Sequence, residues 1–263
     1  MIPSLRPVDE PVRITVIAPV VLPEDSDDLF PVVEGVVFDH RSLAAGTDSI
    51  ESRWDDQFSV PGIIDAAMRA EGAGAEAVII DCMDDPGLDT VREVVRIPVV
   101  GPAEASMHLA LCLAGRFTIL TTADEDIPVV REIVERNRLE HRSASIRGIG
   151  ISPLQLHEDP EKTFRRFAEV ATIAVREDGA EAIIAGCTLL SDLIDRLSEH
   201  LVDVGLDVPV IDPRQAAAHH ARMLVRLGLS HSAVSYPAPP PTPIVWPGPE
   251  MRFGVAGFER GDS

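Results

Sequence analysis

The sequence predicts an α/β fold made of two pseudo-symmetric halves, each a mainly parallel sheet flanked by helices. The first observation is a repeated strand: Gly74–Cys82 returns 105 residues later as Gly179–Cys187, and both copies are apolar runs that end on a cysteine. Two further matches occur in the same order, at offsets of 103 and 111 residues: Arg13–Ala18 with Arg116–Thr121, and Arg96–Pro102 with Asp207–Pro213.

The third observation is that strand-like and helix-like segments alternate along the chain, which is typical of parallel βαβ units. In open parallel sheets, ligands bind outside the carboxyl ends of the strands. Cys82 and Cys187 both follow such ends. The repeat therefore predicts that the two cysteines face each other across a cleft between the halves.

The first half is expected to span residues 12–115. Buried strands are indicated by apolar, β-branched runs, and helices by longer apolar periodic segments. The expected elements, with exposed loops at 19–30 and 39–57, are a strand at 12–18, a strand at 32–38, a helix at 63–72 with Pro61 near its first turn, the first cysteine strand, a helix from Pro86 through Val95, a strand at 97–101 and a helix at 103–114.

The second half is expected to span residues 116–213, and the last helix (214–228) is expected to return to the first half. The elements are a strand at 116–121, a helix at 125–137 with Pro128 in its first turn, a strand near 145–151, a helix at 160–178, the second cysteine strand, a strand in 207–213 and the last helix to about 227. Residues 235–263 are expected to form a proline-rich extended tail, which Trp246 and Phe253 would pin to its own or a neighbouring subunit; an SH3-type ligand is the alternative.

Composition excludes several classes of function. The formal charge is −20, from 43 acidic and 23 basic residues, and a field of that sign repels nucleic acid. No apolar run is long enough for a membrane helix and the start is not a signal peptide, so we expect a cytoplasmic protein. Three cysteines, without metal-ligand spacing, argue against a disulfide framework and a metal site. Nucleotide-binding and serine-hydrolase motifs are lacking from the sequence.

Two thiols on opposite sides of a carbon suit proton exchange with inversion. A thiol has an ordinary pKa of about 8.5, so both protonation states are accessible near working pH. Helices that begin near Pro86 and Thr188–Leu189 are expected to stabilise the thiolates and lower their pKa values. A lone cysteine is more often a small buried hydrophobe, the interpretation that we give to Cys112; the paired placement favours chemistry for the other two.

Other polar residues are weaker candidates. Thr121 and Thr122 lie at the same sheet edge, where they either orient a substrate oxygen or cap the strand. His108 is interpreted as a hydrogen-bonded core residue on an apolar helical face. The adjacent residues His219 and His220 are placed away from the cleft, and the pair Asp84 and Asp85 is interpreted as a cap of the helix near Pro86.

Several runs resemble the aspartate/glutamate/hydantoin racemase superfamily, most closely its hydantoin racemase branch, over most of residues 13–230. They are Ser49–Asp55, Val60–Gly62, Cys82–Leu88 (CMDDPGL, the most specific), Pro98–Ala105 and Thr121–Thr122. The resemblance implies two α/β halves, no cofactor, no metal, a homo-oligomer, and Cys82 and Cys187 as the paired acid and base. It implies substrate contacts from loops after the strands: Pro19, Val20, Met83, Thr121, Thr122, Thr188 and Leu189.

The sequence departs from that branch in two loops. Hydantoin racemases commonly show Asn-Pro-Asn-Thr after the first strand, where this chain has Ala18–Val21 (APVV). After the second cysteine they usually show Ala-Gly-Met, where this chain has Thr188–Leu190 (TLL); Gly186–Thr188 and Val210–Pro213 are more similar to the amino-acid racemases. We therefore expect a more apolar pocket than in either branch.

The predicted function is that of a cofactor-independent racemase or epimerase acting at a carbon next to a carbonyl. The expected substrate is a small molecule: a 5-substituted hydantoin, an allantoin-like compound or an amino-acid derivative. Alternatives within the superfamily are a maleate-type cis–trans isomerase and a decarboxylase. Outside it, the alternatives are a non-catalytic small-molecule-binding protein and a dithiol redox switch.

Overall fold

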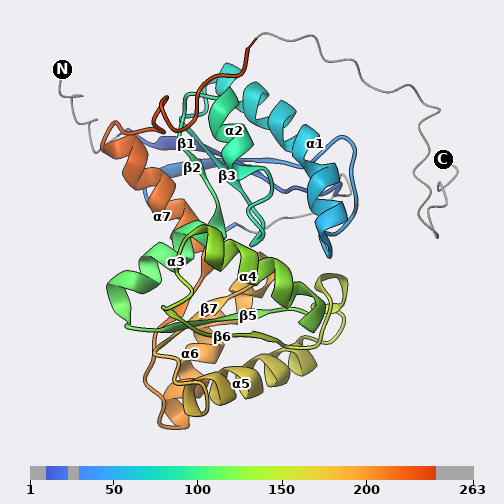
Figure 1. Ribbon diagram of the computed structural model, residues 1–263, viewed down its shortest axis with the longest axis vertical. Helices are drawn as coiled ribbons and strands as arrows, with labels where there is room; N and C mark the ends of the chain where they lie inside the picture. Colours follow the sequence, from blue (N-terminus) through green and yellow to red (C-terminus); the bar gives the residue numbers. More distant parts are fainter. Residues whose placement is uncertain (1–9, 23–29, 241–263) are drawn as a thin grey trace, which may run out of the picture.

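The computed structural model describes residues 10–22 and 30–240 as two parallel four-stranded sheets, one in each half (Figure 1). The strand orders are β2-β1-β3-β4 and β6-β5-β7-β8, so each half places its first strand between its second and third. The first sheet consists of β1 (Val12–Ile17), β2 (Val36–Arg41), β3 (Ala77–Ile80) and β4 (Val99–Val100), and the second of β5 (Phe117–Thr121), β6 (Ser143–Gly148), β7 (Ala182–Ala185) and β8 (Val210–Ile211). The predicted fold class is confirmed.

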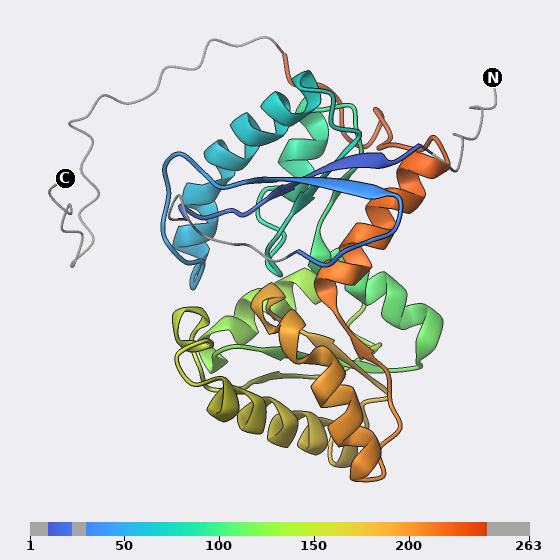
Figure 2. The same cartoon turned by 180° about the vertical axis from the view of Figure 1, so that it is seen from behind.

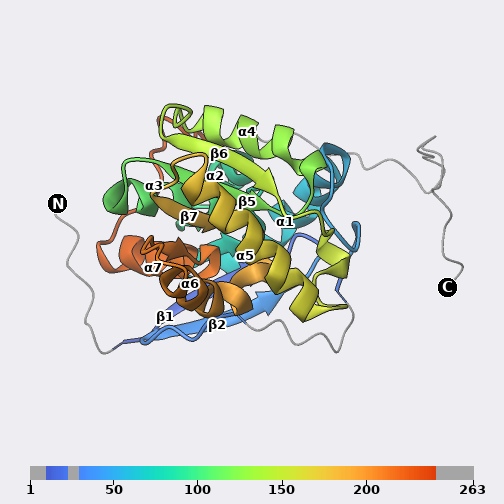
Figure 3. The same ribbon diagram turned by 90° about the horizontal axis from the view of Figure 1, so that it is seen from below.

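Helices cover both faces of each sheet. They are α1 (Arg53–Gly72), α2 (Leu88–Val94), α3 (Pro102–Leu113), α4 (Ile127–Arg136), α5 (Pro160–Arg176), α6 (Ile194–Asp203) and α7 (Pro213–Arg226). In the second half, α4 lies on one side of the strands and α5 and α6 on the other, which Figure 3 shows from below. The alternation along β7 explains this arrangement, because Ile184 packs in the cluster with α3 and α4 while Ile183 packs with α5 and α6.

The last helix, α7, returns to the first half. It packs against α3 and against strands β1, β3 and β4, and it crosses the boundary between the halves (Figure 2). Alanines 216, 217, 218 and 221 are buried on the face that makes this contact. Small side chains allow the helix to approach the sheet and α3 closely, so the second half is followed by a segment that is built into the first.

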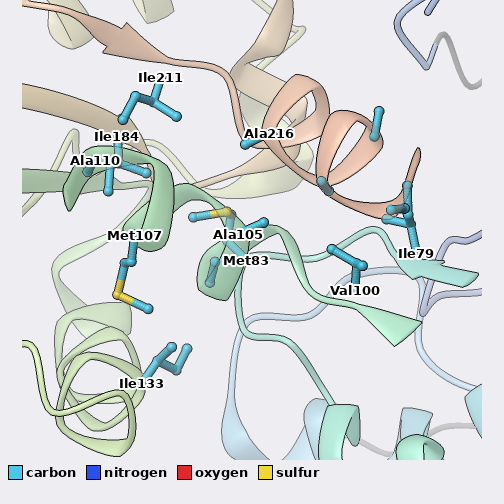
Figure 4. Close-up of a cluster of buried hydrophobic side chains, with 14 of the residues drawn as sticks. Ile79, Met83, Val100, Ala105, Met107, Ala110, Ile133, Ile184, Ile211 and Ala216 are labelled. Atoms are coloured by element: carbon cyan, nitrogen blue, oxygen red, sulfur yellow. The ribbon is translucent and has the colours of Figure 1, made fainter. Parts of the chain in front are cut away.

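A hydrophobic cluster joins the two halves. Ile79 and Val100 of the first sheet belong to the same buried cluster as Ile184 and Ile211 of the second (Figure 4). Helix α3 supplies Met107 and other residues between them. Burial of such side chains stabilises a fold by about 1.5–3 kcal/mol each, so the contact between the halves is an extension of the core.

Several expected boundaries were wrong in the first half. The strand expected at 32–38 is β2 at Val36–Arg41, and the loop expected to reach residue 57 ends where α1 begins at Arg53. Pro61 lies inside α1 rather than in its first turn. Ser52 caps this helix by accepting a hydrogen bond from the backbone N–H of Asp55, and its hydroxyl also donates to the Asp55 carboxylate at 2.8 Å.

Other local interpretations also need correction. The helix expected to begin near Thr188–Leu189 starts later: a 3-10 helix spans Thr188–Leu193, and α6 begins only at Ile194. His108 and Cys112 are exposed near the end of α3, because the buried face of that helix runs through its first turns to Ala110.

The tail prediction falls mostly outside the described residues, as do Trp246 and Phe253. Within the described ranges, no helix combines the length and apolarity needed to cross a bilayer.

Candidate active site

A cavity of about 420 Å³ lies at the carboxyl ends of the strands of both sheets. A volume of this size is within the range of small-molecule sites. Its walls are formed by Ala18, Pro19, Val20, Leu22, Asp48, Ser49, Ile50, Asp81, Cys82, Met83, Asp84, Thr121, Thr122, Asp126, Pro153, Leu154, His157, Gly186, Cys187, Thr188, Leu189 and Arg214.

All nine residues singled out from the sequence line this one cavity. Pro19 and Val20 follow β1, and Met83 follows β3. Thr121 ends β5 and Thr122 comes directly after it, and Thr188 and Leu189 follow β7. Four strand ends thus converge on the same space, two from each half. The roles assigned to these residues remain proposals.

The two cysteines occupy equivalent positions. Ile80 ends β3 and Ala185 ends β7, and each cysteine follows two residues later. Ile80 pairs with Ile17 of β1, as Ala185 pairs with Leu120 of β5, so the strand registers correspond as well. Both sulfurs are partly buried and line the cavity.

The thiols do not have the lowered pKa values expected from the sequence. Burial raises the pKa of Cys187 to about 12, and burial together with the charge of Asp84 raises that of Cys82 well above its ordinary value. Each sulfur accepts a backbone hydrogen bond from the residue two positions later, Asp84 or Leu189, which partly offsets burial. Both groups are therefore thiols at neutral pH.

Gly186 sets the position of the second cysteine. A Cβ atom on this residue would lie 2.7 Å from the carbonyl oxygen of Leu120 and 2.9 Å from Cα of Thr121. The Gly186 N–H donates to that same Leu120 carbonyl at 2.8 Å. Only glycine permits the end of β7 to run this close to β5, and the next residue is Cys187.

A buried ion pair fixes the other side of the site. Arg214, the second residue of α7, donates from Nη2 to Asp81 at 2.7 Å and from Nε at 3.3 Å. The two side chains are 6% and 2% exposed. Asp212 caps the same helix and accepts a hydrogen bond from Ser191, beyond Cys187. The start of α7 is therefore bonded to both cysteine loops, through Arg214 to Asp81 and through Asp212 to Ser191.

The threonines are held by Asp126, which the sequence did not single out. One carboxylate oxygen accepts from the hydroxyl of Thr122 at 2.7 Å, from that of Thr121 at 3.3 Å and from the backbone N–H of Ala123 at 2.9 Å. Both hydroxyl protons are engaged by this carboxylate. The oxygens of the threonines are consequently left as acceptors toward the cavity.

The Asp84–Asp85 pair was expected to cap the helix near Pro86, and this expectation was wrong. The helix begins later, at Leu88, after Gly87 with a φ of 65°. Asp85 caps α3 instead, where its two carboxylate oxygens accept from the backbone N–H groups of Ala103 and Glu104 at 3.0 and 2.9 Å. Asp84 lines the cavity, and burial together with Asp56, Asp126 and Asp85 raises its pKa to about 8.

Several wall residues were missed at the sequence level. Ser49 and Ile50 belong to a run that carried the family resemblance, so their signal was available. Pro153, Leu154 and His157 come from the segment after β6, where no sequence pattern indicated a site. Among the residues described, no group of histidine, cysteine and acidic side chains is arranged to hold a metal ion.

The chain is similar to known proteins in sequence and in fold. A sequence model of the Asp/Glu/Hydantoin racemase family matches residues 32–221. A hydantoin racemase of Rhizobium meliloti is 37% identical over 199 residues, which are 74% of this chain and 80% of that protein. Two solved structures are similar over 89% of this chain: allantoin racemase from Klebsiella pneumoniae (TM-score 0.81, 28% identity, 96% of that chain) and from Pseudomonas fluorescens (TM-score 0.78, 27%, 100%).

Proposed function

The chain belongs to the Asp/Glu/hydantoin racemase family, and from that premise we propose that Cys82 and Cys187 together exchange a proton at one carbon of a 5-substituted hydantoin. The coarser assignment, an isomerase of the hydantoin and allantoin racemase kind, follows from the relatives. The observation that carries the finer proposal is that two thiols at equivalent strand ends line one cavity.

The proposed reaction uses the thiols as a matched acid and base. A thiolate on one side removes the proton from C5 of the ring, which leaves an enolate on the adjacent carbonyl. The thiol on the other side then delivers its own proton to the opposite face of C5. The first sulfur ends as a thiol and the second as a thiolate. This exchanged pair of protonation states is the one from which the reverse reaction starts.

The charges around the sulfurs favour Cys187 as the thiolate that starts the cycle. Arg214 lowers the pKa of Cys187, against burial and Asp81. At Cys82 the charge of Asp56, and that of Asp84 once it ionises, adds to burial in raising the pKa. Burial keeps both values high, so the fraction of thiolate is small at neutral pH and grows as the pH rises. Below about pH 8, where Asp84 is protonated, the rate of exchange is expected to rise with it.

The polarity of the walls favours a neutral ring over a free amino acid. Arg214 is already paired with Asp81, and the remaining charged groups on the described wall include Asp48 and Asp126. A substrate carboxylate would meet these acidic residues without an unpaired cation to hold it. Pro19, Val20, Ile50, Pro153 and Leu154 supply apolar surface for a substituent.

Hydrogen–deuterium exchange tests this proposal. Single enantiomers of 5-substituted hydantoins are incubated with the protein in deuterated water, and deuterium at C5 is followed together with loss of optical rotation. We expect exchange in the wild type and a loss of about 10²-fold or more in Cys82→Ser and Cys187→Ser, the typical contribution of an acid or base. Cys112→Ser, exposed on α3, is the matched control and should retain full activity.

Other outcomes point to the alternatives. Tight binding of a hydantoin without exchange would indicate a binding protein. Turnover of maleate or of a malonate without exchange at C5 would indicate the cis–trans isomerase or the decarboxylase. A Cys82–Cys187 disulfide formed under mild oxidant would favour the redox switch.

A further inference from the structure

Asp84 is a carboxyl group on the cavity wall that no protein group engages. Its backbone N–H donates to the Cys82 sulfur, but its carboxyl group makes no hydrogen bond or ion pair with any other described residue. The other acidic groups of the inner wall are occupied: Asp81 by Arg214, and Asp126 by the two threonines. Asp48 is on the exposed rim. Asp84 is partly buried, lies two residues beyond Cys82, and is therefore available to a ligand next to a reacting sulfur.

The surroundings of Asp84 keep it protonated. Besides burial, the groups that act on it are the carboxylates of Asp56, Asp126 and Asp85, and all three raise its pKa, to about 8. Asp84 in turn acts on both thiols, so Cys82 and Cys187 also face it. At neutral pH the group is a carboxylic acid, which carries an O–H donor and a carbonyl acceptor side by side.

We propose that Asp84 pairs as a carboxylic acid with the carbonyl and N–H edge of a cyclic ureide, donating to the carbonyl beside the reacting carbon and accepting from the neighbouring N–H. The inference rests on the proposed function and names the part of the substrate that the site recognises. In a hydantoin this edge consists of the C4 carbonyl and N3–H. The two edges are complementary, because the O–H of the acid faces the carbonyl oxygen of the ring and the acid's carbonyl oxygen faces the ring N–H.

The donated hydrogen bond also acts in the reaction. When a thiolate removes the C5 proton, negative charge develops on the C4 oxygen, and a donor already placed there stabilises it. The acid keeps its proton throughout, so the balance of protons between the two sulfurs is unchanged. The same group discriminates among substrates, because it offers no counter-ion to a free carboxylate.

Two substitutions separate hydrogen bonding from charge. Asp84→Asn keeps a donor and an acceptor side by side, whereas Asp84→Leu removes both. At neutral pH we expect kcat/KM for deuterium exchange to fall less than about tenfold in Asp84→Asn and about 10²–10³-fold in Asp84→Leu, the usual cost of removing one such donor. Asp195→Asn makes the same substitution at an exposed position of α6 and should leave the exchange rate unchanged. Equal activities of the Asn and Leu variants at neutral pH would overturn the proposal.

The pH dependence gives an independent readout. Above about pH 8 the wild type loses the Asp84 proton, while an asparagine does not titrate. The ratio of kcat/KM for Asp84→Asn to that of the wild type should therefore be constant below about pH 7 and rise about tenfold per unit above pH 8. Ionisation of the substrate affects both proteins equally and cancels in the ratio. A ratio that stays flat to pH 10 would contradict the proposal.

Methylation of the substrate tests the pairing itself. An N3-methyl hydantoin cannot donate to Asp84, so methylation should lower kcat/KM at least tenfold in the wild type and have little effect in Asp84→Leu. Equal effects in both proteins would show that the edge is not recognised by Asp84. If the wild type exchanges neither substrate, the proposed function fails; if it exchanges the unmethylated one without this coupling, only the role of Asp84 fails.

Discussion

Arg214 and Asp81 form the ion pair that ties α7 to the end of β3, and the structure allows the effect of removing either partner to be estimated. We predict that Arg214→Met lowers the free energy of unfolding by about 3–5 kcal/mol. Both side chains are almost fully buried, at 6% and 2% exposure, so solvent cannot replace the lost cation. Breaking a buried pair leaves an uncompensated charge in the interior, and that penalty is the source of the predicted loss.

The double variant separates the pair from its members. In Asp81→Leu/Arg214→Met no charge is left behind, so we expect it to be more stable than either single variant. Arg69→Met is the matched control: its ion pair with Asp65 on α1 is 78% and 64% exposed, and its loss should cost no more than about 0.5 kcal/mol.

Urea unfolding, followed by circular dichroism, measures these differences, with the slope of the transition checked for constancy between variants. The reasoning is refuted if Arg214→Met costs no more than Arg69→Met. It is also refuted if the double variant loses at least the sum of the two single losses, because the charges would then act independently.

Two further predictions concern the surroundings of the site. Gly186→Ala places a Cβ atom 2.7 Å from the backbone oxygen of Leu120, so we expect a loss of about 1–3 kcal/mol and slower deuterium exchange as Cys187 is displaced; Gly72→Ala, with no atom within 4 Å, is the control, and equal effects would refute the clash. Burial and Asp55 raise the pKa of Asp56 to about 6. The folded protein is therefore most stable, with respect to this group, where Asp56 is protonated, and it loses that stability as the pH rises through 6 and a buried carboxylate forms. Asp56→Asn should therefore raise the free energy of unfolding by about 1–3 kcal/mol at pH 8 and hardly at pH 4, and a pH-independent effect would contradict this assignment.

The repeated cysteine strand was sufficient to predict the fold class and the convergence of strand ends. A local run of apolar residues shows where a buried parallel strand lies and where it ends. Since ligands bind at the carboxyl ends of such strands, the positions of Cys82 and Cys187 could be predicted from the sequence. The start of α1 was also accessible but was missed, since the capping residue Ser52 lies in a polar run that was interpreted as a loop. The helix after the second cysteine was expected, but its start was placed at Thr188–Leu189, where the chain forms a 3-10 helix before α6 begins at Ile194.

Other features of the site depend on distant contacts that no local pattern encodes. Asp126 holds the threonines only because η1 (Asp124–Asp126) folds back on the end of β5. Arg214, at the start of α7, meets Asp81 across 133 positions of sequence. The raised pKa values of the thiols reflect burial by both halves together, whereas the sequence suggested only the helix that follows each cysteine.

The two cysteine loops differ in sequence, Met83-Asp84-Asp85 against Thr188-Leu189-Leu190. Thermodynamics limits the effect that this difference can have on the kinetics of the two enantiomers. Mirror-image molecules with one stereocentre have equal free energies in solution, so their equilibrium constant is one. The Haldane relation then requires equal kcat/KM values for the two enantiomers of such a substrate, however unequal the loops. Their asymmetry can appear only as compensating differences in kcat and KM, with one enantiomer bound more tightly and turned over more slowly than the other.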